Sequence, residues 1–149
     1  MYNCYDKFET FLDTLKKTDA SKIFSQNISF TEFMQLKIVR YFVSKSEREV
    51  VAVSELVGNS CVTAQAISKC LRILEKKGFI ERNPNSKDRR ITEVALTDEG
   101  VRVYEITKDE LNSVMSEVFS EFTDKERQDF EILSDKFLNL YSAAIDRRL

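Results

Sequence analysis

The segment 62–97, VTAQAISKCLRILEKKGFIERNPNSKDRRITEVALT, constrains the fold of this chain more than any other part. Its first half predicts a helix that begins at an N-cap, Thr63, and runs to about Lys77, just ahead of Gly78. One face of this helix carries an apolar stripe, formed by Ile67, Cys70, Leu71 and Leu74. The opposite face carries polar and cationic side chains at the same spacing: Gln65, Ser68, Lys69, Arg72 and Lys76. The first face can bury against a core, and the second can lie along a DNA groove.

A basic hairpin follows this helix directly. The runs Phe79–Arg82 and Ile91–Leu96 have the composition of two strands. The turn between them is supplied by turn-forming and polar residues: Pro84, Asn85, Ser86, Lys87 and Asp88. A helix with a polar outer face followed by a basic hairpin is typical of a recognition helix and its wing.

The charge of the chain is unevenly distributed, although its net charge is only −2. Residues 62–90 contain eight Lys or Arg and three Asp or Glu, whereas residues 91–149 contain seven and fourteen. Binding to phosphates depends on a local basic patch and not on the total charge. A solvated charged surface would explain the numbers, but it would not explain why the basic cluster coincides with the helix and hairpin.

Further helices are expected on both sides of this segment. Residues 3–17 form an amphipathic helix, and 18–28 read as a connection. Ser29 and Glu32 form a capping box at the start of the next helix. This helix is apolar around most of its circumference, so we expect it at the centre of the fold. Val50–Val53 can make a short extended segment, and Ser54–Val57 starts a short helix.

Two long helices complete the chain. Thr97 caps a helix from Asp98 to about Phe122, and Thr123 with Glu126 forms a second capping box that opens the last helix. The predicted fold class is therefore mainly α with a small β wing. We expect one chain, 1–149, with a winged helix-turn-helix in residues 30–97 and a helical dimerisation part in residues 1–20 and 98–149.

The helices at the chain ends carry apolar faces that exceed what a small winged domain can cover. Burying one Phe or Leu side chain stabilises a protein by roughly 1.5–3 kcal/mol, so leaving these faces exposed to water would be unfavourable. A second copy is the expected cover, because closed two-fold dimers are the commonest oligomers. The residues expected in the dimer interface are Tyr5, Phe8, Leu12, Phe130, Leu133, Phe137, Leu140 and Tyr141.

Several functional classes fit the sequence poorly. The chain has no His and no Gly-rich phosphate loop, so we expect neither an enzyme, nor a bound cofactor, nor a metal site. We expect no membrane span, because the sequence has no apolar run of sufficient length. Its N-terminus does not have the pattern of a signal peptide. Its three cysteines then fit a reducing compartment, and a cytoplasmic location is expected.

The sequence resembles the MarR family of bacterial transcription regulators over almost the whole chain. The most similar part is LEKKGFIERNPNSKDRRITEVALTDEG, residues 74–100, with the wing pattern Asp88-Arg89-Arg90, then Leu96-Thr97 and Gly100. The resemblance implies a two-fold, roughly triangular dimer held by the first and the last two helices. It also implies a recognition helix (Thr63–Lys77) in the major groove and a wing (Phe79–Leu96) in the adjacent minor groove.

Each candidate DNA-binding side chain has an expected role. Gln65 can pair with adenine, and Lys69 and Arg72 can donate to guanine. Phosphate contacts are expected from Thr63, Ser68 and Lys87, and Ser68 can also reach a base edge. Arg89 and Arg90 suit a narrow A·T-rich minor groove. The resemblance assigns Asp88 the role of orienting Arg90.

Regulation is less constrained. The resemblance implies a repressor that a small anionic or phenolic effector releases from a pseudo-palindromic operator, and the sequence does not identify the effector-binding residues. One alternative is an oxidant sensor that acts through a cysteine, either Cys4, Cys61 or Cys70. Others are an activator of the same fold and a winged-helix module that binds proteins.

Overall fold

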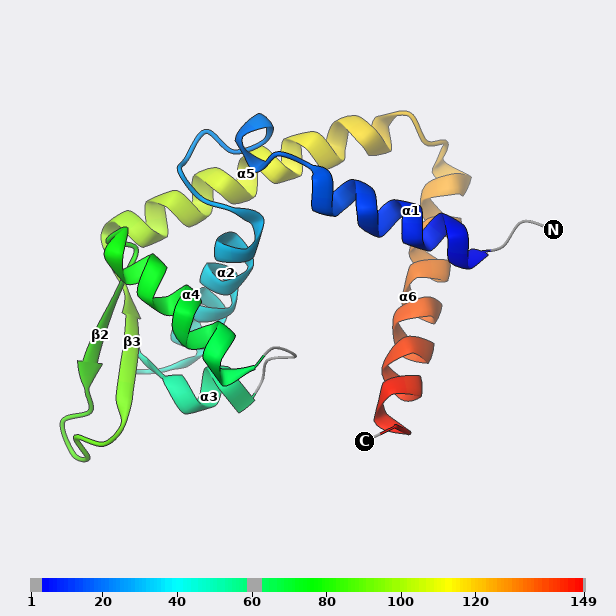
Figure 1. The fold of residues 1–149 in the computed structure, drawn as a ribbon. Helices are drawn as coiled ribbons and strands as arrows, with labels where there is room; N and C mark the ends of the chain where they lie inside the picture. Colours follow the sequence, from blue (N-terminus) through cyan, green and yellow to red (C-terminus); the bar gives the residue numbers. More distant parts are fainter. Residues whose placement is uncertain (1–3, 59–62, 149) are drawn as a thin grey trace. The chain divides into compact units, whose positions relative to one another are not determined.

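A computed structural model describes residues 4–58 and 63–148 (Figure 1). The elements in chain order are α1 (Cys4–Lys17), the 3-10 helix η1 (Ala20–Lys22), α2 (Phe30–Lys45), β1 (Val51–Ala52), α3 (Val53–Gly58), α4 (Ala64–Lys76), β2 (Ile80–Pro84), β3 (Thr92–Leu96), α5 (Asp98–Ser120) and α6 (Asp124–Asp146). The chain divides within α5 into two compact units, Met1–Leu111 and Asn112–Leu149. The chain is thus mainly α with one small sheet, as predicted.

The sheet is antiparallel, with strand order β1-β3-β2. The hairpin of β2 and β3 projects beyond α4 (Figure 1), with Ile80 opposite Leu96 and Pro84 opposite Thr92. The predicted strand bounds were wrong by one or two residues, since β2 starts after Phe79 and extends to Pro84, and β3 starts after Ile91. Proline is tolerated in β2 because this is an edge strand, where a missing N–H breaks no ladder.

The core of the first unit lies between α2, α3, α4 and the sheet. Its fully buried side chains include Leu36 of α2, Leu56 of α3, Leu71 of α4 and Val94 of β3. The apolar stripe predicted for α4 is buried, with Ile67, Leu71 and Leu74 at 0% exposure and Cys70 at 9%. Burial of this stripe fixes which face of α4 is left for solvent.

One prediction about the first unit needs correction. The segment 18–28 is more than a connection, because it contains η1 and contributes two core residues, Phe24 and Ile28. Helix α2 is central, and its apolar side chains are not all buried. Met34 and Tyr41 are about half exposed on it, and the polar Gln35 is buried.

Helix α4 is closed at both ends by local hydrogen bonds. At its start, the Thr63 hydroxyl accepts the N–H of Ala66 at 3.2 Å. At its end, Gly78 has φ +75°, a backbone conformation that glycine adopts without a side-chain clash. Its N–H donates to the Glu75 carbonyl and the Phe79 N–H to the Leu74 carbonyl, both at 2.9 Å. This pair of bonds is the Schellman motif, which turns the chain from the helix into β2.

The second unit consists of the end of α5 and all of α6. The predicted capping box is present, with the Thr123 N–H donating to the Glu126 carboxylate at 2.8 Å. The rings of Phe119, Phe122 and Phe130 cluster around the turn between the helices. None of the described α6 residues is buried. Within the described ranges, no helix has the length and apolarity needed to cross a bilayer.

Candidate DNA-binding interface

The outer face of α4 presents the polar side chains that the sequence singled out. Gln65, Lys69 and Arg72 are exposed, and Ser68 is half-buried. The Nε of Arg72 lies 3.4 Å from the Ser68 carbonyl, so this guanidinium runs back along its own helix. The face is therefore available to a ligand that approaches α4 from solvent, whereas the opposite face is held in the core.

The wing presents a second group of cations. Lys87, Arg89 and Arg90 are exposed at the turn between β2 and β3. Asp88 accepts from the Arg90 N–H at 3.0 Å and from its Nε at 3.1 Å. The hydrogen bond from the Arg90 side chain, with that of its backbone N–H, lowers the pKa of Asp88, which keeps the carboxylate charged. The structure thus places Asp88 and Arg90 in contact, and the role of this pair toward DNA stays a prediction.

Helix α4 and the wing turn border one hollow. This hollow has a volume of about 420 Å³ and is lined mainly by polar side chains from α3, α4, the sheet and the wing turn: Ser54, Ser68, Arg82, Arg90 and Thr92, with Val53 and Ile91. Ser68 and Arg90, which were predicted separately, therefore border the same space. The other predicted DNA-binding residues do not line it.

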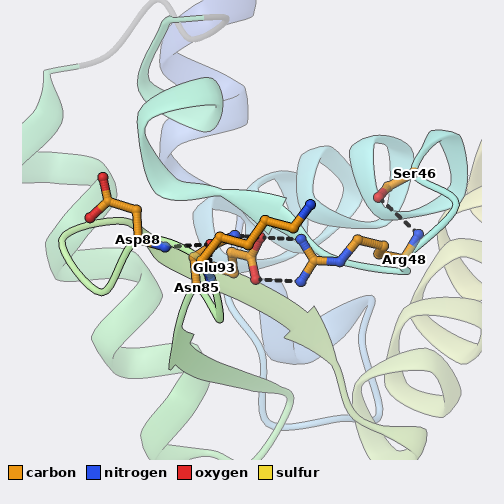
Figure 2. A network of polar contacts seen from close by, with 6 residues as sticks. Ser46, Arg48, Asn85, Asp88 and Glu93 are labelled. Atoms are coloured by element: carbon orange, nitrogen blue, oxygen red, sulfur yellow. Dashed lines mark hydrogen bonds and ion pairs between the residues drawn. The ribbon is translucent and has the colours of Figure 1, made fainter.

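A polar network that links the turn after α2 to the wing turn was not predicted from the sequence (Figure 2). The two guanidinium nitrogens of Arg48 each lie 3.0 Å from an oxygen of Glu93. Asn85 donates to the same carboxylate at 2.6 Å and accepts the backbone N–H groups of Lys87 and Asp88. The sequence predicted Asn85 as a turn residue, and its bonds to the N–H groups of Lys87 and Asp88 agree with that role. The Arg48–Glu93 pair joins residues 45 positions apart and leaves no local signal in the sequence.

Two cations of the basic cluster face carboxylates instead of solvent. Arg82 of β2 pairs with Glu75 of α4, with its Nε at 2.8 Å. Lys77, the C-cap of α4, donates to the Glu32 carboxylate at 2.9 Å and to the Asn27 carbonyl at 2.8 Å. The positive charge offered to a ligand is therefore smaller than the sequence count, and it is concentrated on the outer face of α4 and the wing turn.

The Lys77–Glu32 contact fixes the end of the candidate recognition helix against the start of α2. Burial raises the pKa of Glu32, but hydrogen bonds from Lys77 and the Ser29 backbone outweigh it and lower the pKa from its ordinary value of 4.5. A carboxylate with a lowered pKa in the folded state binds fewer protons there than in the unfolded state. Its stabilising contribution is complete above the unfolded pKa and is lost as the pH falls through the folded one.

We expect Glu32→Gln to reduce the free energy of unfolding near neutral pH and to converge with the wild type on acidification below about pH 4.5. Urea unfolding between about pH 7 and pH 3 measures both curves. Asp109→Asn, which removes an exposed carboxylate from α5, controls for charge loss. Parallel curves for wild type and Glu32→Gln across this range would contradict the assignment.

The cysteines give little support to oxidant sensing within the described residues. Burial raises the pKa of the Cys70 thiol, and the nearby Glu32 carboxylate acts in the same direction. Because the thiolate is the reactive form, Cys70 is poorly suited to react with peroxide. Cys61 lies outside the described residues, and so does the side chain of Cys4. Among the described residues, no group of three or more His, Cys, Asp or Glu is arranged to hold a metal ion.

Comparisons with known proteins identify the family. The family model for MarR matches residues 45–92. The chain is also 30% identical over 115 residues to the HTH-type transcriptional regulator PapX of Escherichia coli, an alignment that covers 77% of this chain and 68% of PapX. The chain belongs to the MarR family. It is accordingly a MarR-type DNA-binding transcriptional regulator, and the resemblance seen in residues 74–100 is confirmed.

A second curated relative and a solved structure extend the comparison. The chain is 32% identical to the Bacillus subtilis regulator YdcH over 74 residues, which is half of this chain and 49% of YdcH. It therefore spans about half the length of that relative. A solved complex of an Escherichia coli MarR mutant with operator DNA has a TM-score of 0.61 at 26% identity, covering 75% of this chain and 76% of that one.

A second solved structure supports the winged-helix fold over a longer span. The MepR–DNA complex of Staphylococcus aureus matches with a TM-score of 0.75 over 93% of this chain and 98% of that one, at 17% identity. This likeness shows the fold alone. Together with the mainly helical architecture and small sheet, it confirms the predicted fold class.

The residues expected in a MarR dimer interface are largely exposed in the single chain. On α6, Phe130, Leu133, Phe137, Leu140 and Tyr141 are between 47% and 63% exposed. On α1, Leu12 is 36% exposed and Phe8 is half-buried, while the Tyr5 side chain lies outside the described residues. Sequence reasoning missed further exposed apolar residues of α6, namely Ile132, Leu138 and Ile145.

Proposed function

We propose that this MarR-family regulator is a dimeric, sequence-specific repressor that a small-molecule effector releases from a pseudo-palindromic operator. One observation carries the proposal: the same unit presents an exposed polar face on α4 and a wing in which Asp88 holds Arg90 by hydrogen bonds. The MarR and MepR structures are complexes with DNA, which supports the same mode of binding for this chain.

The proposed roles follow from the chemistry of each side chain. Gln65, Lys69 and Arg72 read base edges in the major groove from the exposed face of α4. Arg89 and Arg90 enter the minor groove, where narrow A·T-rich sequences attract guanidinium groups. Thr63, Ser68 and Lys87 contact the phosphate backbone, which adds affinity without sequence information.

A second copy of the chain is the proposed cover for the apolar face of α6. That face lies on a helix in which no described residue is buried, and several of its large apolar side chains are more than half exposed. Monomeric proteins rarely leave a contiguous patch of this kind in water. A two-fold dimer would also present two recognition helices to two inverted half-sites about one helical turn apart.

An effector site is proposed in a hollow between α2 and α5 within the first unit. The hollow has a volume of about 310 Å³, at the lower limit for small-molecule pockets. Its lining combines cationic and aromatic side chains suited to an anionic or phenolic molecule: Lys37, Arg40, Tyr41, Ser44, Tyr104, Glu105 and Lys108. Oxidant sensing stays the alternative mode of regulation. We place the protein in the cytoplasm, where operator DNA is accessible.

Selection of bound sequences from random duplex DNA tests this proposal. We expect a consensus of two inverted half-sites about one helical turn apart, with affinity that falls steeply as salt rises. A single half-site would contradict the dimer, and weak, salt-insensitive binding would favour a protein-interaction module. Release of the selected duplex by aromatic carboxylates or phenols would support the effector, and release by peroxide alone would support the oxidant sensor.

Arg90→Ala is expected to lower affinity for the selected duplex by roughly tenfold to a hundredfold, the range of one or two good contacts. The side chain is 91% exposed, so its loss should leave the unfolding transition almost unchanged. A gel-shift titration and a thermal melt measure the two quantities. Full affinity in Arg90→Ala would refute the wing assignment.

A further inference from the structure

We propose that Arg48 and Glu93 are positioning residues for the wing, which set DNA affinity by holding Arg90 in place and do not themselves touch DNA. The inference rests on the proposed function, because it requires that Arg90 contacts DNA. It assigns a role to the network of Figure 2, which connects the end of α2 to the wing turn.

The first link of the network is Arg48, which is itself held by the turn after α2. The Ser46 N–H donates to the Val43 carbonyl at 3.1 Å, and the Ser46 hydroxyl accepts the Arg48 N–H at 3.3 Å. Glu49, next along the chain, has φ +54°, so a tight turn redirects the backbone here. The Arg48 guanidinium therefore extends from a point that is fixed relative to α2.

The second link is Glu93, at the centre of the sheet. Its backbone lies in β3 opposite Ala52 of β1 and Asn83 of β2. Its side chain is only 13% exposed, and its two carboxylate oxygens accept hydrogen bonds from both terminal nitrogens of Arg48 in a bidentate contact. Exposed ion pairs contribute little, but a bidentate arginine–carboxylate pair with one largely buried partner defines a geometry well.

The third link carries the geometry into the wing turn. The Asn85 side chain donates to Glu93 at 2.6 Å, and its amide oxygen Oδ1 accepts the N–H groups of Lys87 at 2.8 Å and Asp88 at 2.9 Å. Asp88 in turn accepts from the side chain of Arg90. An unbroken series of hydrogen bonds thus runs from the turn after α2 to the wing arginine.

This arrangement limits the freedom of an otherwise exposed loop. The Arg90 side chain is 91% exposed, so packing does little to fix its direction. A side chain that is ordered before binding loses less conformational entropy when it binds. Breaking the network at Arg48 or Glu93 would leave Arg90 chemically intact but less well directed, and the loss should appear as weaker DNA binding.

A double-mutant cycle with Arg90 separates this role from the alternatives. Arg48→Ala and Glu93→Gln are each made in the wild-type protein and in Arg90→Ala, and affinity for the selected duplex is measured for all six proteins. We expect each change to weaken binding about three- to tenfold in the wild type, the range of one or two lost hydrogen bonds. In Arg90→Ala the same changes should alter binding less than twofold, because the group they position is gone.

The matched control is Arg102→Ala. Arg102 also forms a two-pronged contact with a carboxylate, Glu99, and is similarly exposed, at 52% compared with 55% for Arg48. It lies on α5, outside the network, and its loss removes the same charge. Urea unfolding of every variant reports whether any loss of affinity reflects loss of folded protein.

Three outcomes would overturn the proposal, and they are distinguishable. Equal losses for Arg48→Ala in both backgrounds would mean that Arg48 contacts DNA itself or acts on overall folding. Full affinity in both Arg48→Ala and Glu93→Gln would show that the wing needs no such support. Full affinity in Arg90→Ala alone would remove the premise, and the proposed function of the wing would fail with it.

Discussion

Replacement of Gly100 by alanine is expected to destabilise the protein by about 3 kcal/mol or more, at the upper end of the range for overpacking. A Cβ at this position would overlap the Phe79 carbonyl oxygen and would lie 2.8 Å from the carbonyl carbon and 3.1 Å from the Phe79 Cα. These are backbone atoms, so no side-chain rotation relieves the clash. The Phe79 carbonyl is further held by the Thr97 N–H at 3.2 Å.

Two further bonds explain why the backbone approaches so closely here. The Thr97 hydroxyl accepts the Gly100 N–H at 2.9 Å and donates to the Gly78 carbonyl at 2.6 Å. The first turn of α5 is thereby drawn onto the turn between α4 and β2. Alanine at position 100 would separate the two turns and disturb the end of α4, the proposed recognition helix, along with the fold.

Urea unfolding of Gly100→Ala measures the effect, and Gly58→Ala is the matched control. Among the described residues, a Cβ at Gly58, the last residue of α3, would meet nothing within 4 Å. The same substitution there should change stability by less than about 1 kcal/mol, with either sign. Wild-type unfolding of Gly100→Ala would show that the close approach does not exist in solution.

The double change Lys69→Ala/Arg72→Ala is expected to weaken specific DNA binding about a hundredfold or more. Each good contact to a base edge discriminates by roughly 1–3 kcal/mol, and two such contacts act together. Both side chains are exposed, on the face of α4 opposite the buried stripe. Their removal should therefore leave the fold intact while the preference for the selected sequence over random DNA declines.

Titrations with selected and random duplexes at one salt concentration measure this preference. Lys22→Ala/Arg102→Ala, on η1 and α5, removes the same charge from surfaces with no proposed DNA contact. That control should lose affinity for both duplexes slightly and equally. If the α4 variant behaved like the control, with an unaltered consensus, the register assigned to the recognition helix would be wrong.

Local sequence signals determined most of the elements. The apolar stripe of α4, the N-caps at Thr63 and Thr97 and the capping boxes at Ser29 and Thr123 all act within one or two helical turns. Their physical causes, which are periodic burial and unsatisfied terminal N–H groups, depend only on neighbouring residues. For the same reason the order of helices and strands followed from the sequence, and strand bounds were less well defined.

Tertiary structure alone decided which residues meet across the fold. Phe24 and Ile28 lie in a segment without periodicity, and only packing against the rest of the first unit made them core. Arg48 and Glu93 are ordinary charged residues in the sequence, and Gly100 meets Phe79 only because Thr97 draws the two turns together. Periodicity in the sequence shows which face of a helix or strand is apolar. Contacts between residues far apart in the chain depend on how those faces pack, and a short stretch of sequence does not contain this information.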